Sequence, residues 1–271
     1  VDINGNEQAG TGILALSTFG PITAGAGYFN NTNVDDSGNG YIGTSDLKLD
    51  GGSDMYVATV QGDLDFVKLE AWYAGMQNSF NSYTLAATSK IDLAENAKLG
   101  LEARWVQLAL DSEVENNLGL AEKDNSMFRF AVDGKFSIVN ARLAYTKTGK
   151  DGGLTALDQD AKNTSLGWAI TSNGAADADY FQAALGADIL DNLNFTLHYG
   201  QLKSKEDSNA TQIRILTDDI KAKEVYGQLT YKMSKNLSTY LRYGTYDEKI
   251  NSTGEKVEDQ TRGRIQVAYT F

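Results

Sequence analysis

The stretch that decides the fold is the C-terminal run Thr261-Arg-Gly-Arg-Ile-Gln-Val-Ala-Tyr-Thr-Phe271. Its odd-numbered positions are Gly263, Ile265, Val267, Tyr269 and Phe271, and its even-numbered positions are Arg262, Arg264, Gln266, Ala268 and Thr270. Successive side chains of a β-strand point to opposite faces, so this alternation predicts a strand with one apolar and one largely polar face. A helical period of 3.6 residues would mix the two sets.

The same alternation recurs along the whole chain. We expect thirteen strands, at residues 11–19, 22–30, 54–62, 65–75, 82–91, 98–109, 126–134, 137–148, 178–190, 193–203, 222–233, 236–247 and 260–271. Short turns alternate with long, polar, acidic loops at 31–53, 110–125, 149–177, 204–221 and 248–259. Short turns at one end and long loops at the other are typical of an outer-membrane barrel. The sequence therefore predicts an all-β, transmembrane antiparallel β-barrel.

A soluble β-sandwich is the alternative, because half-buried antiparallel strands alternate too. Two features favour the barrel. The apolar faces end in Tyr, Phe or Trp near the strand ends, as an interfacial girdle would. The opposite faces carry Arg, Lys and Glu in the middle of strands, which suits a water-filled lumen better than a dry core.

Composition excludes several classes of protein. There is no Cys, which removes disulfide scaffolds and thiolate metal sites, and the only His is His198, which argues against His-rich zinc sites and Ser–His catalysis. We expect His198 to be a hydrogen-bonded lumen residue, and the protein not to be an enzyme. The formal net charge of −12 argues against a nucleic-acid partner, which needs a basic face.

Several segments resemble known outer-membrane proteins. The terminal Tyr269-Thr270-Phe271 resembles the signature read by the barrel-assembly machinery. Gly10-Thr11-Gly12, the run Leu16-Ser-Thr-Phe-Gly-Pro-Ile-Thr-Ala-Gly-Ala-Gly27, and Ala184-Leu-Gly-Ala-Asp188 resemble the epsilonproteobacterial (Campylobacter-type) major outer membrane porins. The resemblance implies a homotrimer of eighteen-stranded barrels in the outer membrane of a Gram-negative bacterium, in contact with lipid and lipopolysaccharide.

The resemblance also bears on where the chain lies within such a barrel. It places five further strands before Val1 and makes residues 1–271 one barrel domain. Residues 1–9 then resemble the end of an infolded constriction loop.

The polar strand faces supply the candidate pore-lining residues, which are Lys68, Glu70, Glu102, Arg104, Arg129, Arg142, His198, Lys232, Arg242, Arg262 and Arg264. We expect Arg129 beside Arg142, and Arg242 beside Arg262 and Arg264. Rows of fixed charge on a pore wall bias which ions pass. The alternative is that these charges simply pair across strands.

A calcium site is a second candidate. Asp35 and Asp36 offer the oxygen ligands that calcium prefers, although the spacing of an EF-hand loop is absent. The resemblance implies a calcium ion at the constriction, with Asp2 and Asp35 or Asp36 as the nearest counterparts. The alternative is that these acids are solvated turn residues. No other cofactor is expected.

These features predict a general-diffusion porin for small hydrophilic solutes and ions. Acidic loops concentrate cations at a pore mouth, and the resemblance implies cation preference, so we expect weak cation selectivity. The alternative function is a surface adhesin or scaffold that acts through its long acidic loops. The small apolar face of Ile22, Ala24, Ala26, Leu85 and Ala87 is expected to allow close contact between barrels in a trimer.

Overall fold

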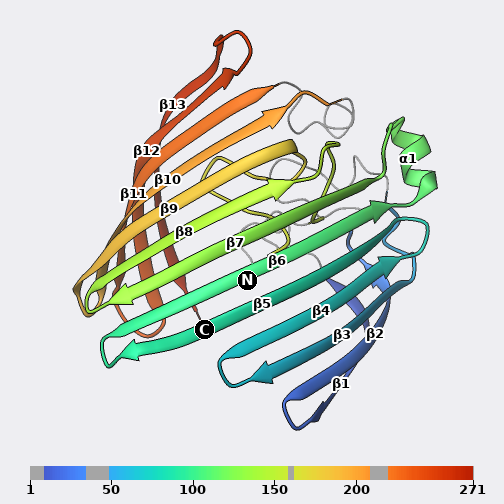
Figure 1. Ribbon diagram of the computed structural model, residues 1–271, viewed down its shortest axis with the longest axis horizontal. Coiled ribbons are helices and arrows are strands. Elements are labelled where there is room, and N and C mark those ends of the chain that lie inside the picture. The colour runs from blue at the N-terminus through green and yellow to red at the C-terminus, as the bar shows by residue number, and fades with distance from the viewer. Residues whose placement is uncertain (1–8, 35–48, 158–161, 208–218, 271) are drawn as a thin grey trace.

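The computed structural model describes residues 9–34, 49–157, 162–207 and 219–270. Within these ranges all thirteen predicted strands form one antiparallel sheet in sequence order (Figure 1). They are β1 (Gly10–Phe19), β2 (Ile22–Thr32), β3 (Met55–Leu64), β4 (Val67–Met76), β5 (Phe80–Ala94), β6 (Ala97–Leu110), β7 (Asp124–Phe136), β8 (Val139–Thr148), β9 (Ala176–Leu190), β10 (Leu193–Lys205), β11 (Ile220–Lys232), β12 (Leu237–Ile250) and β13 (Lys256–Tyr269). The all-β prediction is confirmed.

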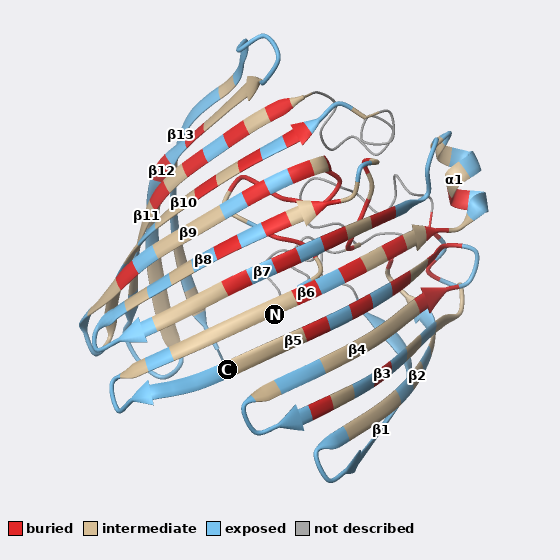
Figure 2. Cartoon of the chain, viewed as in Figure 1, coloured by how far each residue is buried: buried red, intermediate tan, exposed pale blue. Residues whose placement is uncertain are grey.

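Burial alternates along the strands as the sequence period requires (Figure 2). In β9, Ala178 and Tyr180 are buried, whereas Asp179 between them and Phe181 after them are exposed. The buried set faces the inside of the curled sheet, and the exposed set faces outward.

The outward face is a broad apolar surface. Leu185 is 59% exposed, Leu85 55% and Ile265 74%. Aromatic pairs lie near the long-loop ends of the strands, with ring centroids 5.5 Å apart for Tyr28–Tyr56 and 5.3 Å for Tyr73–Tyr83. A soluble monomer rarely exposes so large an apolar face, whereas a membrane barrel requires it together with an aromatic girdle. The chain is thus a transmembrane β-barrel wall, and the soluble-sandwich alternative is wrong.

The turns follow the predicted pattern at one end of the sheet and depart from it at the other. The short hairpin turns carry residues with positive φ, such as Gly20 at 58°, Asp65 at 54° and Ser137 at 52°. At the opposite end, β4 and β5 are joined by only residues 77–79, which breaks the predicted sorting of loops by length.

The predicted loop 248–259 is also shorter than expected. Strand β12 runs to Ile250 and β13 starts at Lys256, and lysines contact acids along this part of the two strands. Lys249 lies 3.4 Å from Asp247, and Lys256 contacts Asp259. Glu258 and Asp259, which the sequence placed in a mouth loop, therefore lie in a strand.

The connection at 111–123 contains a short helix, α1 (Ser112–Leu118). The Asp111 carboxylate accepts a hydrogen bond from Glu113 N at 3.0 Å, and Gly119 ends the helix with a φ of 66°. Val114 packs with Leu108, Leu110 and Leu154. None of the helical segments in the described part of the chain is long and apolar enough to cross a membrane.

The long connection between β8 and β9 turns inward instead of extending away from the sheet. Its first part places Leu154 in a cluster with Met76, Phe80 and Leu108. Its last part places Ile170 in a second cluster with Tyr180, Leu202 and Ile220. The connection therefore reaches from β4–β6 across to β9–β11 on the inner side of the sheet.

Candidate functional site

The candidate site is the inner face of the sheet together with the part of the β8–β9 connection that lies against it. We call residues 162–170 the strap. In Figure 1 the yellow-green segment that follows β8 lies within the curl of the sheet. Polar strand residues meet the strap on this face, which identifies the face as the lumen side.

The most densely charged part of the wall lies on β6 and β7. Arg104 and Arg129 are directly opposite each other in the register, and Glu102 bridges them. Arg129 Nη2 lies 2.6 Å from Glu102 Oε1, and Arg104 Nε lies 3.4 Å from the same oxygen. Because like charges directly opposite repel, the bridging carboxylate is what allows this pair to coexist.

Arg129 also holds one end of the strap. Its Nη1 donates to Thr164 O at 2.7 Å, and its Nη2 donates to Lys162 O at 2.9 Å. Asn163 Nδ2 donates to Thr84 Oγ1 at 2.9 Å, and the Ser165 and Thr146 hydroxyls lie 2.6 Å apart. These polar contacts fix the strap to β5, β7 and β8.

A cavity of about 640 Å³ lies between the strap and strands β4–β8. Six of the eleven predicted pore residues line it, namely Lys68, Glu70, Glu102, Arg104, Arg129 and Arg142. The strap contributes Lys162, Thr164 and Leu166 to the same cavity. Fixed charges of both signs around a space of this volume suit the passage of hydrated solutes.

A second cluster lies on β10–β13. Arg242 donates to Gln228 Oε1 from Nε at 2.8 Å and from Nη2 at 2.6 Å. His198 stacks on Tyr226, with the ring centroids 4.5 Å apart. In the described part of the chain, this ring stacking takes the place of the hydrogen bond predicted for His198. Arg264 lies opposite Arg242, as predicted, whereas Arg262 lies opposite Gly244 and over the Tyr246 ring.

Most of the wall charges are paired, as the alternative interpretation of the sequence proposed. Arg142 lies 2.6 Å from Asp133, its direct cross-strand neighbour, and Lys68 lies 3.2 Å from Glu70. Arg129 and Arg142 lie on the adjacent strands β7 and β8, as expected, and both reach Glu102: Arg142 Nη2 lies 3.8 Å from Glu102 Oε2. In the backbone register, however, Arg129 is opposite Thr146. Lys232 lies at the turn end of β11 and is exposed.

Several predicted residues lie outside the described ranges. These are the proposed calcium ligands Asp2, Asp35 and Asp36, and Phe271 of the assembly signal. Tyr269 ends β13 and is 59% exposed. Within the described residues, no group of three carboxylate or imidazole side chains is placed to hold a metal ion.

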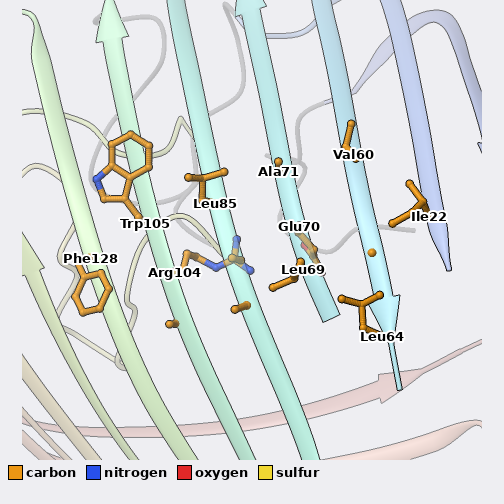
Figure 3. A pocket seen from close by; sticks show the side chains of 14 residues that line it. Ile22, Val60, Leu64, Leu69, Glu70, Ala71, Leu85, Arg104, Trp105 and Phe128 are labelled. Carbon is orange, nitrogen blue, oxygen red and sulfur yellow. The ribbon is translucent and has the colours of Figure 1, made fainter. Parts of the chain in front are cut away.

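The outer face carries a shallow apolar groove of about 540 Å³ over β3–β7 (Figure 3). Small residues at Ala71, Ala87 and Ala103 leave room between larger neighbours such as Leu85 and Trp105. Of the predicted small apolar face, Leu85 and Ala87 line this groove, and Ile22 borders it from the neighbouring strand β2.

Known proteins were compared with the chain at the levels of sequence and of structure. No family model and no curated protein matches it. Solved structures do match. The outer membrane protein OprD from Pseudomonas aeruginosa gives a TM-score of 0.74 at 17% identity, covering 96% of this chain and 68% of that one. OccAB3 from Acinetobacter baumannii gives 0.73 at 16% identity, covering 97% and 68%. The outer membrane protein OpdK from Pseudomonas aeruginosa gives 0.72 at 14% identity, covering 97% and 69%.

These matches bear on the resemblance drawn from the sequence. They support the general likeness to outer-membrane porins and do not support the narrower likeness to Campylobacter-type porins. At these identities the likeness concerns the fold. The chain has the transmembrane β-barrel fold of the outer-membrane porins.

Proposed function

We propose that the chain forms the wall of a diffusion channel for small hydrophilic solutes and ions in the outer membrane of a Gram-negative bacterium. The observation that carries this proposal is the charged cavity between the strap and β4–β8, on the opposite side of the sheet from an apolar outer face. A water-filled polar lumen inside an apolar wall is what passive permeation requires. The proposal involves no catalytic step and no required cofactor.

Weak cation selectivity is part of the proposal. Most wall cations have a carboxylate partner, as Arg129 and Arg104 have in Glu102 and Arg142 has in Asp133. Paired charges largely cancel beyond a Debye length of about 8–10 Å at physiological salt. The net charge of −12 then dominates the longer-range field and favours cations at the entrance.

Planar bilayers test the channel and its selectivity together. The purified, folded protein should give stepwise conductance, and its reversal potential in a KCl gradient should favour potassium weakly. The double variant Asp35→Asn/Asp36→Asn should reduce that preference if the mouth field dominates. Silent bilayers would overturn the channel proposal and favour the adhesin alternative. An anion-favouring potential would instead assign selectivity to the wall arginines.

Trimerisation is a separate proposal, supported by the groove of small residues on the outer face. Ala71, Ala87 and Ala103 would let a neighbouring barrel approach closely, as small residues do between membrane segments. We expect the mass of the protein in mild detergent to correspond to three copies. A monomer under conditions where conductance persists would contradict the trimer without affecting the channel.

The remaining partners are also proposals. Lipid, with lipopolysaccharide in the outer leaflet, would cover the apolar outer face. The barrel-assembly machinery would read the C-terminal signal at Tyr269 and Phe271. Calcium binding by Asp2, Asp35 and Asp36 stays a prediction.

A further inference from the structure

The second end of the strap is held by a buried carboxylate. Glu224 of β11 is 3% exposed. Its Oε1 accepts a hydrogen bond from the backbone N–H of Trp168 at 3.1 Å, and its Oε2 accepts one from Ala169 N at 2.7 Å. Hydrogen bonds to an ionised acceptor are about twice as strong as neutral ones. A single side chain of the wall therefore receives two successive backbone donors of the strap.

The surroundings of Glu224 are shaped for this contact. A Cβ atom at Gly167 would lie 1.8 Å from Glu224 Oε1 and 2.6 Å from Tyr180 Oη. A Cβ atom at Gly200 would lie 3.1 Å from the same carboxylate oxygen. The strap can reach the carboxylate only because residue 167 has no side chain.

This contact fixes the position of the neighbouring Trp168 indole. The indole lies edge-on to the Tyr226 ring, with centroids 5.4 Å apart and an interplanar angle of 70°. The Cζ atom of Arg242 lies 5.3 Å from the indole, 5.0 Å from the Tyr226 ring and 5.1 Å from the Tyr240 ring. Since Gln228 accepts from two of the guanidinium nitrogens, rings and amide surround most of the Arg242 head group.

We propose that Glu224 is a positioning residue of the channel, which holds the strap so that Trp168 covers Arg242 and keeps passing anions from contacting its guanidinium. The inference rests on the proposed channel function. On this proposal, anions pass poorly along Arg242 because the strap covers it, and Glu224 of the wall holds the strap there. Displacing the strap would expose a fixed cation whose hydrogen-bond partner in the described residues is the uncharged Gln228 amide.

The discriminating variant is Gly167→Ala, because it displaces the strap without removing any charge. The matched control is Gly134→Ala, in a strand position where an added Cβ meets nothing within 4 Å. In a KCl gradient, Gly167→Ala should raise the chloride-to-potassium permeability ratio about two- to fivefold. This factor is the free energy of one exposed cation–π contact expressed as a ratio. Gly134→Ala should leave the ratio unchanged.

Substitutions at Trp168 and Arg242 separate this effect from general loosening. Trp168→Ala should shift the ratio as Gly167→Ala does, whereas Trp168→Phe, which keeps a ring, should shift it less. Arg242→Gln should change the ratio little in the wild-type background. In the Gly167→Ala background the same substitution should abolish the gained chloride permeability. Equal ratios for wild type, Gly167→Ala and Trp168→Ala, with unchanged circular dichroism, would overturn the proposal.

A chemical measurement tests the hold on the strap without relying on conductance. The chain contains no cysteine, and Ala169 is 6% exposed, so Ala169→Cys introduces a single buried thiol. Adding Glu224→Ala should accelerate its reaction with a hydrophilic maleimide about tenfold or more, as expected for losing hydrogen bonds to a charged group. Equal labelling rates would refute the role of Glu224. Silent wild-type channels with accelerated labelling would overturn only the proposed channel function.

Discussion

Replacing Glu102 with Gln is expected to lower the free energy of unfolding by about 3 kcal/mol, the largest loss for any lumen substitution considered. Arg104 and Arg129 lie directly opposite each other, and their side chains are only 5% and 10% exposed. Removing the bridging carboxylate leaves two nearly buried guanidinium groups facing each other without the one carboxylate that both of them contact. Breaking a buried ion pair from one side is costly for this reason.

The measurement is urea unfolding of the protein refolded into lipid vesicles, followed by circular dichroism. The matched control is Asp133→Asn, which removes the partner of Arg142 from a pair whose side chains are 47% and 41% exposed. An exposed pair contributes at most about 1 kcal/mol. Equal losses in the two variants would show that water screens the Arg104–Arg129 pair as fully as it screens Arg142.

The strands could be predicted from the sequence because the environment acts on each strand separately. Lipid on one side and water on the other impose a period of two on every crossing. In β10, Phe195 and Leu197 face outward while Thr196 and His198 face inward, and the sequence alone separates these sets. No long-range contact is needed to recognise such a strand.

The strap could not be predicted in the same way. The stretch 149–177 resembles an ordinary polar loop, and its inward course depends on Arg129 and Glu224, which lie 35 and 55 residues from their strap partners. A local pattern cannot reveal contacts at that separation. The one available signal was Leu154, Trp168 and Ile170, which are large apolar residues in a loop that otherwise needs none.

The pairing of wall charges could be predicted only in part: the face of each charged residue could be predicted, and its partner could not. The sequence assigned Arg129 and Arg142 to the lumen face, and both line the charged cavity, but it did not fix which residue lies opposite which. Register depends on the geometry of the turn, and a shift of two residues keeps every side chain on its face while changing all its partners. In the structure the register places Asp133 opposite Arg142 and Thr146 opposite Arg129.

Leu85→Arg is expected to destabilise the protein by about 2–4 kcal/mol, because it would place a charge in the hydrocarbon region of the membrane. Leu85 lies in the middle of β5, between Ala71 and Trp105 on the outer face, and is 55% exposed. In a water-soluble protein, an arginine at so exposed a position would change stability by no more than about 0.5 kcal/mol. A loss of this size therefore reports that the face lies in apolar surroundings, which are either hydrocarbon or the neighbouring barrel of the proposed trimer.

The matched control is Thr88→Arg, three residues along the same strand on the lumen face. Thr88 lines the charged cavity and lies between Lys68 and Glu102, so an added guanidinium finds water there and a carboxylate that offsets the Lys68 charge. We expect this variant to insert and unfold like wild type, whereas Leu85→Arg should fold into vesicles poorly and unfold at lower urea. If both arginines were tolerated equally, the apolar groove over β3–β7 would have to be covered by something other than hydrocarbon. A neighbouring barrel with acidic groups at that contact would then explain the result, and the detergent mass of Leu85→Arg would stay that of the wild-type oligomer.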